Sequence, residues 1–125
     1  MSNSHLSKPA ISIDLRRNCI RIYRRTLRSI GTPEYILLLV NPSDCTLAIQ
    51  SSDHSDPRAY RLPHRGPGNR LCCEITSKSL MENLLHLCKE WQDGCLYRIY
   101  GEIVRSEGVV QFNLTNAVRA CGTRE

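Results

Sequence analysis

The chain has 125 residues, of which 41% are hydrophobic and 23% are charged, a composition typical of soluble globular domains. This composition excludes a disordered or fibrous protein, and the length allows one domain that buries a proper core. The longest apolar run, residues 35–40, is far shorter than the ~20 residues that a membrane helix needs. From the length we expect a single domain over residues 1–125. The N-terminus has no basic segment followed by an apolar one, so we expect a cytoplasmic protein.

The first elements that the sequence predicts are a hairpin and a short helix. Apolar residues alternate with polar ones over residues 11–15 and again over 20–22, which predicts two half-buried strands joined by a tight turn. A short helix is expected at residues 26–31. Gly31, with Pro33 just beyond it, gives a strong stop signal.

A second hairpin and a connector complete the first half. Residues 35–40 are apolar at every position, as in a strand buried on both faces or packed at an interface. Turn-forming residues at 41–44 lead into a partner strand at 46–50. Residues 51–69 are rich in Asp, Pro and Gly and predict a connector, with a further short strand at 59–62.

The second half predicts the same order of elements. Residues 73–76 are expected to form a strand, and residues 79–91 carry apolar side chains at helical spacing. Ser79 and Glu82 have the spacing of a capping box, so the helix is expected to begin at Ser79. A final hairpin is expected over residues 95–114.

Strand, helix and hairpin therefore follow one another twice, in halves 10–63 and 71–118 joined by a loop at 64–70. The ends, residues 1–9 and 119–125, are expected to be disordered tails. We predict an α+β fold with a mainly antiparallel sheet, two helices and pseudo-duplicated halves.

Positive charge is concentrated in the first half of the chain. Residues 1–70 contain 11 Lys or Arg against 5 Asp or Glu, whereas residues 71–125 contain 6 against 7. Arginine supplies most of the excess, and its planar guanidinium makes bidentate contacts with phosphate groups. The pattern favours a polyanionic partner, with a merely solvated basic face as the alternative. The candidate contact residues are Arg16, Arg17, Arg21, Arg24, Arg25 and Arg28.

The cysteines and histidines give no sign of a metal or a disulfide framework. The chain has 7 cysteines, an odd number, and no secretion signal, so we expect reduced thiols. Cys88 falls on the apolar stripe of the long predicted helix, as a small core residue would. The 4 histidines are scattered, and no cofactor or metal is expected.

No catalytic motif is present, so we expect no enzyme. The nearest candidate is the run Asp53, His54, Ser55 and Asp56, which offers a carboxylate, an imidazole and a hydroxyl side by side. Adjacent residues in a loop seldom converge on one reacting atom, which favours a solvated loop.

The order of elements resembles one domain of a DNA sliding clamp over nearly the whole chain. Residues 36–40, 47–53 and 59–63 resemble the strands that follow the first helix of a clamp domain, and residues 75–80 and 109–114 resemble parts of its second half. The resemblance implies a ring-forming, non-enzymatic protein that contacts DNA without reading its sequence.

A second resemblance is local. Residues 11–49, with the early arginine-rich hairpin, the short helix and the second hairpin, resemble the swapped-hairpin DNA-binding domain of AbrB-type regulators. That resemblance implies an intertwined dimer. The contacts it implies are made by Arg16, Arg17, Arg21, Arg24 and Arg25.

From these observations we expect a non-enzymatic DNA-associated protein with a clamp-like architecture and a basic N-terminal contact surface, acting as a homo-oligomer. One alternative is an AbrB-like dimeric transcription regulator that uses the same arginines. The other is a protein-interaction module, in which residues 35–40 build a homo-oligomer and no nucleic acid is bound.

Overall fold

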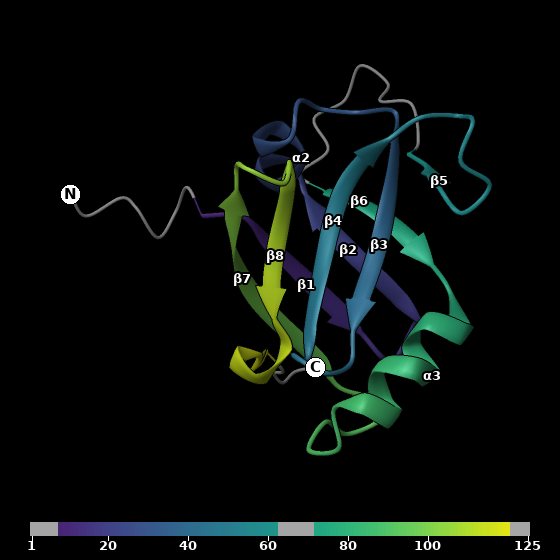
Figure 1. The fold of residues 1–125 in the computed structure, drawn as a ribbon. Helices are drawn as coiled ribbons and strands as arrows, with labels where there is room; N and C mark the ends of the chain where they lie inside the picture. Colours follow the sequence, from purple (N-terminus) through teal and green to yellow (C-terminus); the bar gives the residue numbers. More distant parts are fainter. Residues whose placement is uncertain (1–7, 63–71, 121–125) are drawn as a thin grey trace.

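The structure of the chain, a computed structural model, describes residues 8–62 and 72–120 (Figure 1). The loop expected at 64–70 lies outside the described residues, as do most of the two expected tails. The described elements are nine strands, two α-helices and one short 3-10 helix. The strands are β1 (Ala10–Asp14), β2 (Cys19–Tyr23), β3 (Tyr35–Asn41), β4 (Thr46–Ser52), β5 (Tyr60–Arg61), β6 (Cys72–Thr76), β7 (Leu96–Val104), β8 (Val109–Asn113) and β9 (Val118–Arg119). The helices are α2 (Arg24–Ser29), α3 (Lys78–Leu87) and the 3-10 helix η1 (Leu114–Asn116).

All strands belong to one antiparallel sheet, in the order β5-β3-β4-β8-β7-β1-β2-β6, with β9 beside β7. The sheet curls into a nearly closed barrel whose two ends, β5 and β6, are not paired with each other (Figure 1). The expectation of a mainly antiparallel sheet with two helices is therefore confirmed.

The long strand β7 joins the two sides of this barrel. Its first part, Leu96 to Tyr100, pairs with β1, and its second part, Gly101 to Val104, pairs with β8. Between these two parts, Gly101 pairs with Phe112, and a Cβ placed on Gly101 would lie 2.5 Å from the Phe112 ring. The chain can bend across both sides here because glycine leaves room for that ring.

Strand β1 lies between β2 and β7 and is buried along its whole length. Ile11 and Ile13 point into the barrel and join the hydrophobic core. Ser12 and Asp14 point to the outside, yet both have no exposed surface, because long side chains of neighbouring strands cover them. A central strand of this kind can carry polar side chains only where each is hydrogen-bonded.

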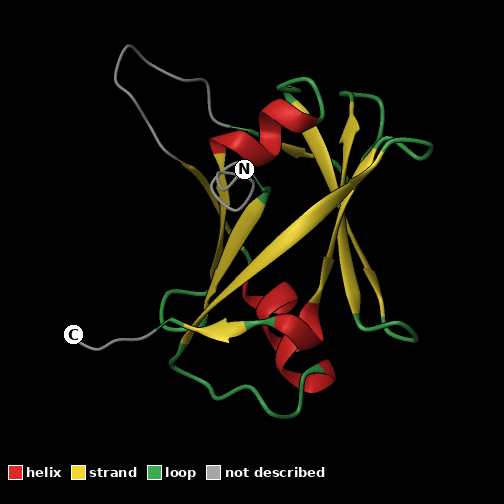
Figure 2. Cartoon of the chain, turned by 90° about the vertical axis from the view of Figure 1, so that its left-hand side faces the viewer, coloured by secondary structure: helices red, strands yellow, loops and turns green. Residues whose placement is uncertain are grey.

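The two helices lie at opposite ends of the barrel (Figure 2). Thr26 fixes α2 to β1, since its hydroxyl accepts a hydrogen bond from the Ala10 amide at 2.8 Å and donates one to the Ala10 carbonyl at 2.7 Å. Helix α3 buries Met81 and Leu84 in the core.

The bounds of both helices differ from those expected. Helix α2 begins at Arg24 and ends at Ser29, before Gly31, whose φ of 89° only glycine adopts without strain. Helix α3 begins at Lys78, because the Ser77 hydroxyl accepts the hydrogen bond of the Leu80 amide; Ser77, not Ser79, is the cap.

The end of α3 also corrects the sequence-based prediction. The helix stops at Leu87, although its apolar spacing continues to Trp91. Trp91 is not on the helix but stacks on Tyr97, with ring centroids 4.7 Å apart. Its apolar spacing therefore reflects packing on β7 rather than helix.

Two expectations about strands also need correction. In β3, Ile36 and Leu37 are buried, but Leu38, Leu39 and Val40 are only half-buried, so the strand is not enclosed along its whole length. Strand β5 covers it only at Tyr35 and Ile36. Arg119, which the sequence placed in a disordered tail, pairs with β7 as part of β9.

Candidate nucleic-acid interface

The tight turn between β1 and β2 holds Arg16 against Asp14. The Asp14 carboxylate accepts hydrogen bonds from the Arg16 amide and Nε at 3.0 Å and from its terminal nitrogen at 3.1 Å. The turn itself needs a positive φ, 56° at Asn18, which Asn tolerates better than most residues. The guanidinium of Arg16 is half exposed beside a fully buried carboxylate.

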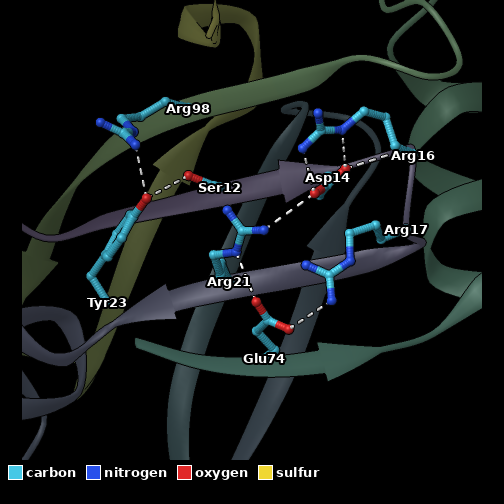
Figure 3. A network of polar contacts seen from close by, with 8 residues as sticks. All are labelled: Ser12, Asp14, Arg16, Arg17, Arg21, Tyr23, Glu74 and Arg98. Atoms are coloured by element: carbon cyan, nitrogen blue, oxygen red, sulfur yellow. Dashed lines mark hydrogen bonds and ion pairs between the residues drawn. The ribbon is translucent and has the colours of Figure 1, made fainter. Parts of the chain in front are cut away.

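Arg21 continues this network across the sheet. It donates to Asp14 at 3.3 Å and, through Nε, to Glu74 on the neighbouring strand β6 at 2.9 Å. Register accounts for the second bond, because Arg21 and Glu74 lie directly opposite each other. Glu74 also pairs with Arg17 at 3.8 Å, so one carboxylate links two arginines (Figure 3).

A second cluster lies beside it and contains Tyr23. The Tyr23 hydroxyl shares a hydrogen bond with Ser12 at 2.9 Å and accepts one from Arg98 on β7 at 2.8 Å (Figure 3). The Arg98 guanidinium carbon lies 5.3 Å from the centroid of the Tyr23 ring and that of Arg25 lies 5.7 Å from it, within cation–π range. Nε of Arg98 is buried without a hydrogen-bond partner, the one such side-chain atom in the described part of the chain.

We call this outward side of β7, β1, β2 and β6, together with the turn at Arg16 and Arg17, the arginine face. Helix α2 follows directly from β2 and adds more positive charge at one end of it. Arg25 donates to the carbonyl of Lys8, Arg24 is half-buried and Arg28 is exposed. The cations of the first half therefore follow β2 and continue onto α2.

The charges of the arginine face do not cancel. Two carboxylates, Asp14 and Glu74, are shared among Arg16, Arg17 and Arg21. Burial by itself raises the pKa of Asp14, but the hydrogen bonds and charge of Arg16, with the charge of Arg21, outweigh it, and the net pKa lies below the ordinary 3.8. Asp14 is therefore ionised at neutral pH, and a positive excess remains on the surface.

The structure brings together some of the arginines that the sequence singled out. Arg16, Arg17 and Arg21 form one network, and Arg25 lies against Tyr23. Among the described residues, neither Arg24 nor Arg28 makes a hydrogen bond or ion pair with this network.

Sequence reasoning missed four residues of this surface. Alternation over residues 19–23 places Tyr23 on the same side as Arg21, so that signal was present. Asp14, Glu74 and Arg98 come from three different strands, and only the pairing of those strands places them here. The missed residues are Asp14, Tyr23, Glu74 and Arg98.

The other chemical candidates have local explanations. Asp53 accepts hydrogen bonds from the Ser55 amide and hydroxyl, and Asp56 binds Arg58, so these carboxylates order their own turns. Burial, with the neighbouring Cys45, raises the pKa of Cys88 to about 12, and its thiol is protonated at neutral pH. Within residues 8–62 and 72–120, no three His, Cys, Asp or Glu side chains come close enough together to hold a metal ion.

The fold and surface define a mainly antiparallel, barrel-like β protein with an arginine-rich outer face. Comparison with models of known families, with curated proteins and with solved structures finds no match. Neither α-helix in the described segments has the length and hydropathy needed to cross a membrane.

Proposed function

We propose that this chain is a non-enzymatic, cytoplasmic DNA-associated protein that contacts phosphate groups through the arginine face. The observation that carries the proposal is the arrangement around Asp14 and Glu74. Guanidinium groups that are distant in sequence lie on one outer face, and the carboxylates among them do not neutralise them. A surface with an excess of guanidinium groups is best suited to binding a polyanion such as DNA.

The buried carboxylate gives the surface a defined geometry. Asp14 fixes Arg16 through its Nε and a terminal nitrogen, and Arg16 keeps about half of its side chain exposed. A guanidinium held in this way loses less conformational entropy when it binds a phosphate than a freely rotating one does. Asp14 therefore acts as a positioning residue for the contact surface.

The strand pairings support a duplicated, clamp-like architecture. The run β2-α2-β3-β4-β5 has the same order as β6-α3-β7-β8-β9. The pair β3·β4 corresponds to β7·β8, and equivalent strands meet in the pairs β2·β6 and β4·β8. The short strands differ, because β5 pairs with β3 on the edge away from β4, whereas β9 pairs with β7 on the same edge as β8. Strand β1 lies between β7 and β2, and the short strand β5 lies at the equivalent edge of β3, beside the opening towards β6.

The position of the helices indicates which surface makes the contact. In a ring of clamp domains the helices of both halves line the DNA channel, but here α2 and α3 lie at opposite ends of the barrel (Figure 2). The sheet face with its arginines, extended by α2, is the better contact surface. A ring would require several copies of this chain.

The AbrB-like alternative makes a different demand on the β1-β2 hairpin. A swapped hairpin dimer pairs such a hairpin with a second chain. Here β1 pairs with β7 and β2 pairs with β6 of the same chain, so both outer edges of the hairpin are occupied. These pairings favour the first proposal.

The protein-interaction alternative depends on β3. Within the described segments, β5 pairs with this edge of β3 only at Tyr35 and Ile36, and the rest of the edge is where a strand of another copy would pair. The apolar surface is small, however, because Val118 is the one large hydrophobic side chain that is largely exposed in the described segments.

The test is fluorescence anisotropy of labelled DNA across a salt series. We expect binding that weakens with salt, and a slope of log affinity against log salt that falls by about one for each phosphate contact removed. Arg17→Gln with Arg28→Gln removes two exposed cations of the contact surface. Glu74→Gln removes a competing carboxylate and is expected to steepen the slope by about one.

The control is Arg58→Gln, which removes a guanidinium of similar exposure in the loop between β4 and β5. Its salt slope is expected to stay at the wild-type value. An absence of salt-dependent binding by the wild-type protein would overturn the proposal, and so would equal losses in Arg58→Gln and the double variant.

A further inference from the structure

We infer that the arginine face binds single-stranded rather than duplex nucleic acid. The inference rests on the proposed function, since it names the form of nucleic acid that the same surface takes. Three observations carry it: the shape of the sheet, the order of the cations along β2, and the fixed Tyr23 ring among them.

The first observation concerns shape. The arginine face is the outer side of a nearly closed barrel and therefore curves away from a partner (Figures 1 and 2). A rigid duplex is itself a convex cylinder, so the two surfaces meet along a narrow strip and few phosphates come within reach. A single strand is flexible and can follow the curvature, which lets successive phosphates contact successive cations.

The second observation concerns the order of the charges. Along β2 and into α2 the surface presents Arg17, then Arg21, then Tyr23 with Arg25 against its ring. The strand itself, Cys19–Tyr23, has 5 residues and spans about 15 Å, with Arg17 in the turn before it and Arg25 in the helix after it. A single file of cations of this length matches one phosphate backbone, whereas a duplex groove presents two.

The third observation is that the Tyr23 ring lies within this row of cations. Two hydrogen bonds to the Tyr23 hydroxyl, from Arg98 and with Ser12, fix the ring on the surface. Tyrosine rings and guanidinium planes are both surfaces on which unpaired bases stack. Bases inside a duplex are already stacked and cannot use this ring, so the tyrosine adds affinity only for a single strand.

The unused donor of Arg98 lies beside this ring. Its Nε is buried and has no hydrogen-bond partner among the described residues, while its terminal nitrogen binds Tyr23. A small shift of the Arg98 side chain on binding would bring the donor to an oxygen of a base or phosphate. Arg98 belongs to the second half of the chain, so both halves contribute to the same site.

The experiment compares a labelled oligothymidine with a labelled mixed-sequence duplex of equal length, at several salt concentrations. We expect the single strand to bind at least about tenfold more tightly at each salt concentration. Unlabelled ribo- and deoxyribo-oligonucleotides then compete against the labelled strand, which identifies the preferred sugar. A single strand of either sugar that competes better than the duplex supports the inference.

Variants of Tyr23 separate stacking from charge. Tyr23→Leu removes the ring, and we expect it to weaken single-strand binding by about fivefold or more while the salt slope is unchanged. Tyr23→Phe keeps the ring and loses only the hydroxyl, so it is expected to retain most of the affinity. The matched control is Tyr35→Leu, a half-buried tyrosine on β3, outside the arginine face.

Photocrosslinking provides a readout on the unaltered protein, should Tyr23→Leu fail to fold. A single strand containing iodouridine is irradiated with the wild-type chain, and the adduct is located by mass spectrometry of peptides. An adduct at Tyr23 supports the inference, and adducts confined to other aromatic residues overturn it.

The outcomes distinguish the two levels of the proposal. Equal or tighter binding of the duplex overturns the single-strand inference and leaves the proposed DNA association standing. Binding of neither form at low salt overturns both.

Discussion

Asp14 is the residue on which the geometry of the arginine face depends. It is the one fully buried carboxylate among the described residues, and its partners are Arg16 and Arg21. Asp14→Asn keeps the shape but removes the negative charge that Arg16 and Arg21 share, while Arg21 keeps its bond to Glu74. We expect the free energy of unfolding at pH 7 to fall by about 1–3 kcal/mol, as for other charged hydrogen bonds lost from a buried position.

The pH dependence of that effect follows from the pKa of Asp14, which lies below its ordinary value in the folded protein. Because the folded pKa is lowered, the stabilisation is complete above the unfolded value near 3.8 and is lost as the pH falls towards the folded pKa. Urea unfolding of both proteins between pH 7 and pH 3 measures this. A difference between wild type and variant that persists undiminished at pH 3 would contradict the assignment.

Gly101 is a second residue whose identity is dictated by its surroundings. A Cβ there would lie 2.6 Å or less from two Phe112 ring carbons and 2.8 Å from the Gln111 carbonyl oxygen, and that backbone atom cannot move aside easily. We expect Gly101→Ala to destabilise the protein by about 1–3 kcal/mol through overpacking.

Phe112→Leu tests the mechanism, because it makes room beside Gly101 at its own cost in buried surface. The double variant is expected to lose less free energy of unfolding than the sum of the losses in the two single variants. Chemical denaturation of the wild type and the three variants measures this difference. Strict additivity would show that the ring is not the obstacle.

At the scale of single elements, α3 provides a clean comparison of two serines. The Ser77 hydroxyl caps the helix by accepting from the Leu80 amide at 3.2 Å, whereas the sequence favoured Ser79. Ser77→Ala is expected to cost about 1 kcal/mol of stability. Ser79→Ala, inside the first turn and exposed, serves as the control and should change stability by less than about 0.5 kcal/mol in thermal or urea unfolding. Equal effects of the two substitutions would refute the assignment of the cap.

The elements themselves were largely predictable, because each has a local cause. Alternation of Ile with polar residues gives β1 and β2, and Gly31 marks the stop of α2. The ends of α3 were misplaced because two causes overlap in the sequence. Ser79 matched the capping-box pattern better than Ser77, because Glu82 follows it at the required spacing, whereas Leu80 stands at that position after Ser77. The spacing of Trp91 reflects packing on Tyr97 rather than helix.

At the scale of the whole molecule, the pairing of strands could not be predicted from local pattern. The arginines of the first half were visible as a charge cluster, but their counter-charge Glu74 and their neighbour Arg98 lie on β6 and β7. Local sequence sets which face a side chain takes on its strand, and non-local pairing sets which strand is adjacent. The candidate site was therefore only half predictable: its charge and the side of β2 on which Tyr23 lies follow from local pattern, but its partners Glu74 and Arg98 do not.

The same pairings predict that neither half of the chain folds alone. Strand β1 pairs with β7, β2 with β6, and β4 with β8, so every large contact of the first half except its own two hairpins involves the second half. Isolated hairpins are marginally stable in water. We expect separate fragments of residues 1–62 and 63–125 to lack the circular dichroism and dispersed NMR spectrum of the whole chain. The whole chain is expected to unfold in one cooperative transition. If residues 1–62 alone gave a native-like spectrum, the two halves would be independent domains that associate later to form the barrel. If an unfolded fragment regained structure on mixing with its complement, this would demonstrate directly that the strands of the two halves depend on each other.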